Sequence, residues 1–404
     1  MKFENFLASR ILSYKRYKNS VSSPIIKISI FSIIIAVTVI NFSVSIGFGI
    51  QNEIKNKFSL ISGDFYVSNF KNENFSTFYP IDLNEINFLK LKNNFDYVNK
   101  VIYNPGIIPI KNNFQEVVFK GIESSNINFL NSFIKDSGKI QIKNNEIIIS
   151  EKLSNKLNIN LQDNVKFLFF KNENSKIPIV RKFNVVGLYN SSISEFDSRV
   201  VIGNIEQSLS INKWDNNYVG ALELSLNNKN DSMKSIDLLY SSIPSSYDIQ
   251  QSSDRFPEIY SWINLFDTNI YLIITLMIIV GGINMITALL VTVLDKTKLI
   301  ASLKVLGSNN NSIKKIFMIN GFYLILRGVI LGNLISLSLM LLQKYFMIIK
   351  LDPNTYYSDY VPIEIDPFNL FLTNLIVVVI SLAMLIIPSN VISKIKPNST
   401  FKLS

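Results

Sequence analysis

Four long apolar stretches constrain this chain more than any other feature of its sequence. They cover residues 28–50, 267–294, 316–349 and 368–388. A helix needs about 20 apolar residues to cross a hydrocarbon core about 30 Å thick. The composition agrees, because 48% of the residues are hydrophobic and only 17% are charged. We therefore predict an α-helical membrane protein with four transmembrane helices.

Basic residues are concentrated beside these stretches. Segments 1–27, 295–315 and 389–404 hold 14 of the 40 Lys and Arg residues but only two of the 30 Asp and Glu residues. Basic residues next to a membrane span favour the cytoplasmic side, so we expect both termini and the 295–315 loop in the cytoplasm. Segments 51–266 and 350–367 are then extracytoplasmic. Nucleic-acid binding is disfavoured, because the positive charge adjoins the membrane rather than a soluble face.

Segment 51–266 separates the first two stretches and is long enough to bury a core of its own. It alternates runs rich in β-branched and aromatic residues with shorter helical patterns. We predict a large extracytoplasmic α+β domain here. In segment 1–27, Phe3, Phe6, Leu7 and Ile11 share one helical face, which indicates a cytoplasmic interfacial helix; a merely solvated start is the alternative.

The residue types that most enzymes use are missing. The chain has no Cys and no His, which excludes disulfides, thiolate or imidazole metal sites and Ser-His-Asp triads. A phosphate-binding P-loop needs an upstream Gly followed by Gly-Lys-Ser/Thr, and the one Gly-Lys pair, at 138–139, precedes Ile140. We expect no catalytic residue, no metal site and no cofactor held by this chain.

Polar residues inside the apolar stretches need partners. Asn41, Asn284 and Asn333 each fall within one, and an amide in hydrocarbon favours hydrogen bonds across helices; lining a substrate cavity is the alternative. Arg327 suits the inner interface, with 313–326 continuing the third helix into the headgroups. An ion relay is the other possibility for Arg327.

Segment 295–319 predicts a short amphipathic helix followed by a turn. Ile300, Leu303 and Leu306 share one face of residues 296–306, and Gly307 is a natural stop for the helix. Asn311 or Ser312 is expected to cap the next helix. An apolar face beneath a membrane bundle needs burial, and we expect a cytoplasmic partner protein to bury it.

The same segment resembles the coupling stretch of FtsX/MacB-type ABC transporter permeases, E-[KR]-x-x-E-I-A-x-L-[KR]-x-L-G-A. Within that superfamily the chain most resembles the lipoprotein-releasing (Lol-type) permeases. Four further stretches carry this resemblance in order, at residues 6–16, 183–197, 356–365 and 388–402. In the second of them the family pattern has Gly where this chain has Ser192, so a different loop geometry is expected there.

The resemblance implies a MacB-like periplasmic core in segment 51–266 and a location in the bacterial inner (cytoplasmic) membrane. It also implies a second permease subunit, identical or paralogous, and a separate cytoplasmic ATPase dimer that binds ATP and Mg²⁺. That ATPase would push on the coupling stretch, and closure of the bundle would lift a lipoprotein from the outer leaflet toward a periplasmic carrier. The implied ATPase-coupling residues are Lys296, Lys298, Ile300, Leu303, Lys304, Leu306 and Gly307.

Two further sites follow from the resemblance. A hairpin between residues 165 and 187 occupies the place where one Lol permease binds its carrier, and its tip would comprise Asn174, Ser175, Lys176, Ile177 and Pro178; an ordinary solvated turn is the alternative. The lipid cavity would lie between the first two spans, with Phe42, Phe48, Met277 and Met285 as candidates. Plain helix packing is the alternative role for each of these four.

Three other functions remain open from the sequence. An FtsX-like permease would use the same coupling to regulate a cell-envelope hydrolase by mechanotransmission. A MacB-like efflux subunit would carry its ATPase fused at the N-terminus. A membrane-anchored receptor would not need the 296–306 pattern.

Overall fold

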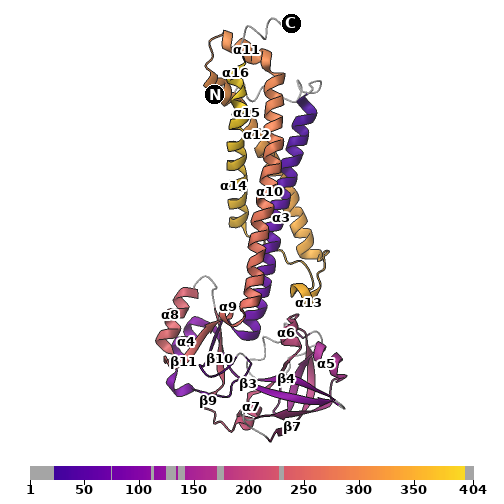
Figure 1. Ribbon diagram of the computed structural model, residues 1–404, viewed down its shortest axis with the longest axis vertical. Helices are drawn as coiled ribbons and strands as arrows, with labels where there is room; N and C mark the ends of the chain where they lie inside the picture. Colours follow the sequence, from indigo (N-terminus) through magenta and orange to yellow (C-terminus); the bar gives the residue numbers. More distant parts are fainter. Residues whose placement is uncertain are drawn as a thin grey trace. The chain divides into compact units, whose positions relative to one another are not determined.

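Figure 1 shows the computed structural model of the chain, which describes residues 22–73, 75–110, 113–123, 133–134, 142–170, 177–226 and 232–395. The chain forms two compact units. The helical unit comprises the chain up to Gln51, residues 263–350 and the chain from Tyr360 onward. The sheet unit comprises residues 52–262 together with the short segment 351–359.

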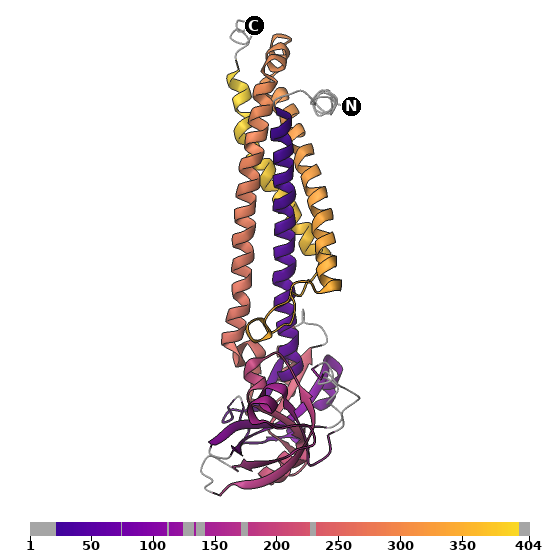
Figure 2. The same cartoon turned by 90° about the vertical axis from the view of Figure 1, so that its right-hand side faces the viewer.

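Four long helices are each apolar and long enough to cross a membrane, as predicted. They are α3 (Ser22–Ser62), α10 (Pro257–Asp295), α12 (Asn310–Phe346) and α14 (Pro367–Met384). Both α3 and α10 run well beyond the predicted stretches, because apolar residues at helical spacing continue on one face: Ile54, Phe58 and Ile61 of α3 are buried. Figures 1 and 2 show the long helices running alongside one another within the helical unit.

Short helices complete the helical part of the chain. They are α11 (Thr297–Val305), α15 (Ile386–Ser389) and α16 (Val391–Lys394), whereas α13 (Pro353–Tyr356) lies in segment 351–359 of the sheet unit. The third predicted helix is continuous through Arg327, whose side chain is exposed on α12. Most of the predicted interfacial helix lies outside the described residues, and residues 22–27 belong to α3.

Close packing of α3 on α12 depends on two glycines one turn apart. A Cβ atom on Gly328 would lie 2.6 Å from Cγ2 of Ile33, and one on Gly332 would lie 2.8 Å from Cβ of Val37. Real Cβ atoms do not approach neighbours so closely, so only glycine fits. Such small-xxx-small pairs let membrane helices approach one another and gain dispersion energy.

Amide side chains join all four of the long membrane helices. The Asn41 amide donates to Oδ1 of Asn333 at 2.9 Å and to Oγ of Ser336 at 3.1 Å. Asn374 donates to Oδ1 of Asn333 at 2.9 Å, and Asn333 donates to Oδ1 of Asn374 at 3.0 Å. Asn284 donates to Oγ of Ser32 at 2.6 Å. The interhelical hydrogen bonds predicted for Asn41, Asn284 and Asn333 are confirmed, and Asn374 is an additional member.

The sheet unit has the predicted α+β composition. Its nine-stranded sheet has the order β11-β1-β10-β3-β4-β8-β5-β7-β6, and β2 pairs with β9. The strands are β1 (Phe65–Asn69), β2 (Ile81–Asp82), β3 (Phe95–Ile110), β4 (Asn113–Ile122), β5 (Glu146–Ser150), β6 (Asn164–Phe169), β7 (Ile179–Tyr189), β8 (Val200–Asn204), β9 (Tyr218–Val219), β10 (Ala221–Leu226) and β11 (Tyr247–Gln251). The helices are η1 (Leu83–Glu85), α4 (Phe88–Asn94), α5 (Glu151–Leu157), α6 (Ser194–Asp197), α7 (Ile205–Asn212), α8 (Ser232–Ser242) and α9 (Ser252–Arg255).

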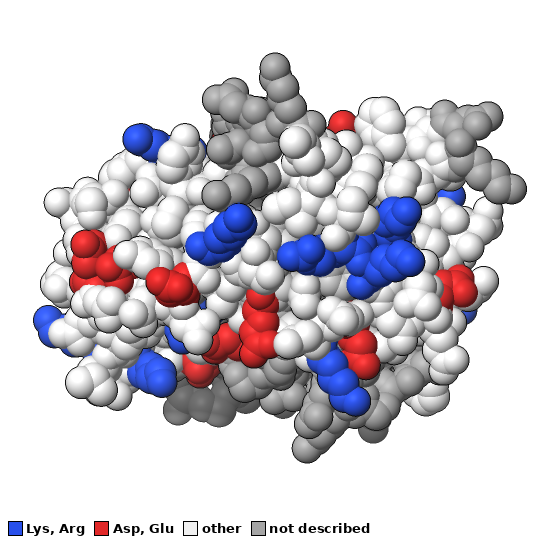
Figure 3. Space-filling view, turned by 90° about the horizontal axis from the view of Figure 1, so that it is seen from below, with Lys and Arg blue, Asp and Glu red and all other residues white. Residues whose placement is uncertain are grey.

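Six strands of this sheet close into a barrel. Strand β6 pairs with β3 at Gly106↔Phe169, which joins the two ends of the series β3-β4-β8-β5-β7-β6. The barrel interior is filled by aromatic rings, with Phe119 stacked on Phe183 at a centroid distance of 5.1 Å. A second core lies where α4 and α8 cover β1, β3 and β10. On the face drawn in Figure 3, basic and acidic side chains are interspersed among uncharged surface.

A charged cluster is buried in the sheet unit. Lys120 Nζ lies 2.8 Å from Oε2 of Glu223 and also donates to the carbonyl oxygen of Ile61, near the end of α3. The Arg255 guanidinium lies 3.7 Å from the ring centroid of Tyr66 and 3.9 Å from Oε1 of Glu223. Burial raises the pKa of Tyr66 to about 12 and lowers the pKa of Lys120. The cluster thereby ties the end of α3 and helix α9 to strands β4 and β10.

We expect substitution of Lys120 to lower the urea concentration at which the sheet unit unfolds. In Lys120→Met the buried Glu223 carboxylate loses its ammonium partner, which costs about 3–5 kcal/mol for a buried pair. Lys100→Met is the matched control, because the Lys100–Glu123 pair is one-third exposed and is worth about 0–1 kcal/mol. Urea unfolding of the full chain in detergent, followed by the fluorescence of Trp214 and Trp262, measures both; both Trp residues lie in the sheet unit. Equal losses in the two variants would contradict this account.

Candidate functional site

The predicted amphipathic helix is present between two long helices. Helix α10 ends at Asp295, α11 spans Thr297–Val305, and the turn to α12 passes through Gly307 at φ +86°. A Cβ on Gly307 would meet nothing within 4 Å, so the left-handed backbone alone requires glycine there. The cap of α12 is Asn309, whose side chain accepts from the amide of Asn311, rather than the predicted Asn311 or Ser312.

The apolar face of α11 is divided between the chain's own core and solvent. Ile300 and Leu303 are buried and pack with Ile313 and Phe317 of α12. The expectation that a partner buries these two residues is therefore corrected: the helical unit covers them. Leu306 follows the last helical residue and is 81% exposed, and Val305 is 67% exposed. These two residues form the exposed tip of α11.

The lysines of this segment have different surroundings. Lys296 Nζ lies 2.7 Å from the carboxylate of its neighbour Asp295. Lys298 is exposed, on the same helix as Ser302, which is also exposed. Lys304 turns inward, and its Nζ donates to the carbonyl oxygens of Ile392 at 2.9 Å and Ile395 at 2.8 Å. Of the three, Lys298 is the lysine most open to an external partner.

Three of the four lipid-cavity candidates lie in or against one cluster of the helical unit. Met285 is fully buried in the core of the helical unit, where Phe48 and Met277 pack partly buried against the same cluster. Phe42 is also partly buried. Contact between a lipid chain and Met285 would require the bundle to open.

The hairpin proposed for carrier contact is present in its strands. Strands β6 and β7 pair antiparallel, with Phe169 opposite Ile179 at the end nearest the tip. Ile177 is 84% exposed and Pro178 is partly exposed. The other three tip residues, Asn174, Ser175 and Lys176, lie outside the described residues.

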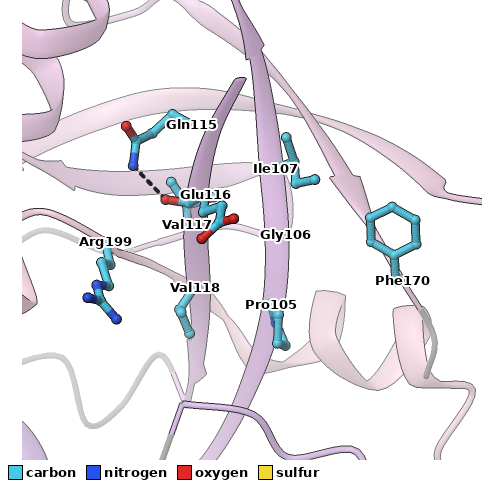
Figure 4. Close-up of a pocket in the computed structure, with 9 residues that line it drawn as sticks. All are labelled: Pro105, Gly106, Ile107, Gln115, Glu116, Val117, Val118, Phe170 and Arg199. Atoms are coloured by element: carbon cyan, nitrogen blue, oxygen red, sulfur yellow. Dashed lines mark hydrogen bonds between the residues drawn. The ribbon is translucent and has the colours of Figure 1, made fainter. Parts of the chain in front are cut away.

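A trough lies beside the end of β6 that is nearest the hairpin tip. As Figure 4 shows, Phe170 stands on one side of strands β3 and β4 and Arg199 on the other, with Pro105, Gly106 and Ile107 between them. Its volume is about 410 Å³, and Gln115, Glu116, Val117 and Val118 complete the lining. The Gln115 amide donates to the carbonyl oxygen of Glu116 at 2.7 Å. The trough offers an apolar floor between an aromatic ring and a guanidinium group, and sequence reasoning did not find it because its lining comes from four separate segments.

The loop before α6 keeps the geometry of a glycine. Ser192 has φ +61°, in the left-handed region that glycine favours, so the backbone there is one that a glycine would readily adopt. Ser191 donates from its hydroxyl to Oδ1 of Asp197 at 2.6 Å. Burial raises the pKa of the Asp197 carboxyl, yet its hydrogen bonds bind the loop to α6. Within the described ranges, no group of three or more acidic side chains is arranged to hold a metal ion.

Residues 271–397, from within α10 to just beyond α16, match the family model described as FtsX-like permease C-terminal. Over these residues the chain is similar to FtsX-like permeases, and the part of the chain that the structure describes holds four helices long and apolar enough to cross a membrane. The resemblance predicted from the coupling stretch is thus confirmed.

Individual proteins are similar to this chain over most of its length. The lipoprotein-releasing system transmembrane protein LolC of Buchnera aphidicola subsp. Acyrthosiphon pisum (strain APS) is 25% identical over 321 residues, which cover 77% of this chain and 78% of the relative. LolC of Buchnera aphidicola subsp. Schizaphis graminum (strain Sg) is 23% identical over 400 residues, 95% of this chain and 94% of the relative. Among solved structures, the periplasmic region of MacB from Actinobacillus actinomycetemcomitans covers 52% of this chain and 98% of its own length, at 14% identity and a TM-score of 0.33.

Proposed function

We propose that this chain is the permease subunit of an ABC transporter that extracts lipoproteins from the outer leaflet of the bacterial inner membrane. The observation that carries the proposal is the similarity to two LolC proteins, one of them over 95% of this chain. The α10–α11–α12 arrangement supports it, because it leaves an exposed apolar tip, Val305 and Leu306, at the end of a helix that also carries the exposed Lys298. Both chain termini would then be cytoplasmic and the sheet unit periplasmic.

An external source of energy is required for this reaction. Moving an acyl chain out of a membrane costs about 0.8 kcal/mol for each buried CH₂ group, so a lipoprotein with several chains does not leave unaided. The described residues include no phosphate-binding loop, so a separate cytoplasmic ATPase dimer would supply the work. We propose that it binds the exposed tip of α11, with Lys298 beside it. A second permease subunit would complete the bundle.

Transfer to a periplasmic carrier would use the sheet unit. Ile177 and Pro178, at the end of the β6–β7 hairpin, offer an apolar contact, and the trough between Phe170 and Arg199 offers a second one. Apolar contacts suit a carrier that itself has to hold acyl chains.

Loss of the apolar tip is expected to release the ATPase. Leu306→Asp puts a charge into the proposed contact, and co-purification of the ATPase with the full chain should fall by about tenfold or more, as for a central interface residue. Leu89→Asp is the matched control, because Leu89 of the sheet unit is also 81% exposed. Pull-down of the ATPase in detergent measures both. Retention of the ATPase by Leu306→Asp would exclude this contact.

Depletion of the chain is expected to leave outer-membrane lipoproteins in the inner membrane. Sucrose-gradient fractionation of the membranes and immunoblotting for a lipoprotein measure the shift. Normal lipoprotein distribution together with a cell-wall or division defect would instead favour an FtsX-like regulator of an envelope hydrolase.

Removal of the hairpin tip is expected to weaken carrier binding. Ile177→Asp should raise the Kd of the purified full chain in nanodiscs for the periplasmic carrier by about tenfold, and deletion of residues 171–178 should abolish binding. Leu161→Asp, at another exposed loop position of the sheet unit, serves as the control. Unchanged binding after the deletion would rule out the hairpin as the contact.

A further inference from the structure

The fourth membrane helix does not continue unbroken into the cytoplasmic tail. Helix α14 ends at Met384, and two single turns, α15 and α16, follow it. Pro388 cannot donate the backbone hydrogen bond that would continue the helix through Met384. Residues 385–395, which we name the terminal arm, follow α14 with Leu385 and Asn390 in the right-handed helical region but without one unbroken ladder of α-helical hydrogen bonds.

The terminal arm packs on the α11–α12 turn. Leu385 and Ile392 of the arm are fully buried in the same core as Ile300 and Leu303 of α11 and Phe317 of α12. Pro388 and Ser389 are buried as well. The arm is thus joined by side-chain packing to the segment that resembles the coupling stretch.

Two lysines fix the arm by hydrogen bonds. Lys304 of α11 donates to the carbonyl oxygens of Ile392 and Ile395, with the carbonyl of Ser393 at 3.5 Å. The last carbonyls of a helix have no amide partner within it and carry partial negative charge, so a lysine ammonium is well suited to them. Lys314 of α12 donates to Oδ1 of Asn390 at 2.8 Å.

We propose that Lys304 is a positioning residue that makes α11 and the terminal arm move as one body. The functional part of this inference rests on the proposed function. If the ATPase pushes on the tip of α11, the force passes through Lys304 to the end of the fourth membrane helix. Lys304 itself does not touch the ATPase. The tip binds the ATPase, and the inward side of the same helix holds the arm.

Spin labels test whether the two segments move together. The native chain has no Cys, so Cys substitutions at Ser302 of α11 and Ile387 of the arm, both exposed, give a specific label pair. The distance distribution by pulsed EPR should be narrow in the purified chain and should not change in the ATPase complex between the nucleotide-free and vanadate-trapped states. The distance distribution should broaden in Lys304→Met. It should narrow again in Lys304→Arg, because arginine restores a cationic side chain with several N–H donors. A native distribution that shifts with nucleotide, or one unaffected by Lys304→Met, would overturn the proposal.

Transport assays test the consequence. Lys304→Met should co-purify the ATPase as the native chain does, but release of lipoprotein from proteoliposomes should fall by about tenfold, the scale of one lost charge-assisted hydrogen bond. Lys315→Met, which removes an exposed lysine of α12, should leave release at the native level. Full release by Lys304→Met would contradict the coupling role. If even the native chain bound no ATPase, the proposed function would fail, while the EPR result would still decide whether Lys304 holds the arm.

Discussion

Hydrocarbon offers no hydrogen-bond partner to a peptide group, and this constraint governs the whole chain. It makes each apolar stretch a helix, and it makes every polar side chain within the stretches seek another. Asn41, Asn333 and Asn374 satisfy one another across α3, α12 and α14.

Sequence reasoning located the elements whose physical signal is local. The number of membrane helices, the short helix before Gly307 and the partners required by buried amides all follow from length, periodicity and the cost of unpaired polar groups. The helix ends did not follow, because α3 continues to Ser62 on a buried face formed with the sheet unit's own residues. The spacing of apolar residues shows that one face of a helix is apolar, but it does not show which other residues pack against that face.

The sites were less predictable for the same reason. Ile300, Leu303 and Leu306 look equivalent in the sequence, yet the first two face the chain's own core and only Leu306 is exposed. Nothing in the sequence around Lys304 indicates that its hydrogen-bond partners are carbonyl groups almost 90 residues further along the chain. The trough beside Phe170 and the buried Lys120–Glu223 pair likewise depend on segments brought together by sheet pairing.

The glycine pair of α12 limits how this bundle can rearrange. The side chains of Ile33 and Val37 pack directly against the backbone of Gly328 and Gly332, where any larger residue would clash. Sliding α3 along α12 would move Ile33 and Val37 away from the two glycines and toward the larger side chains of α12. We therefore expect any rearrangement of the bundle to keep α3 and α12 packed together at this point.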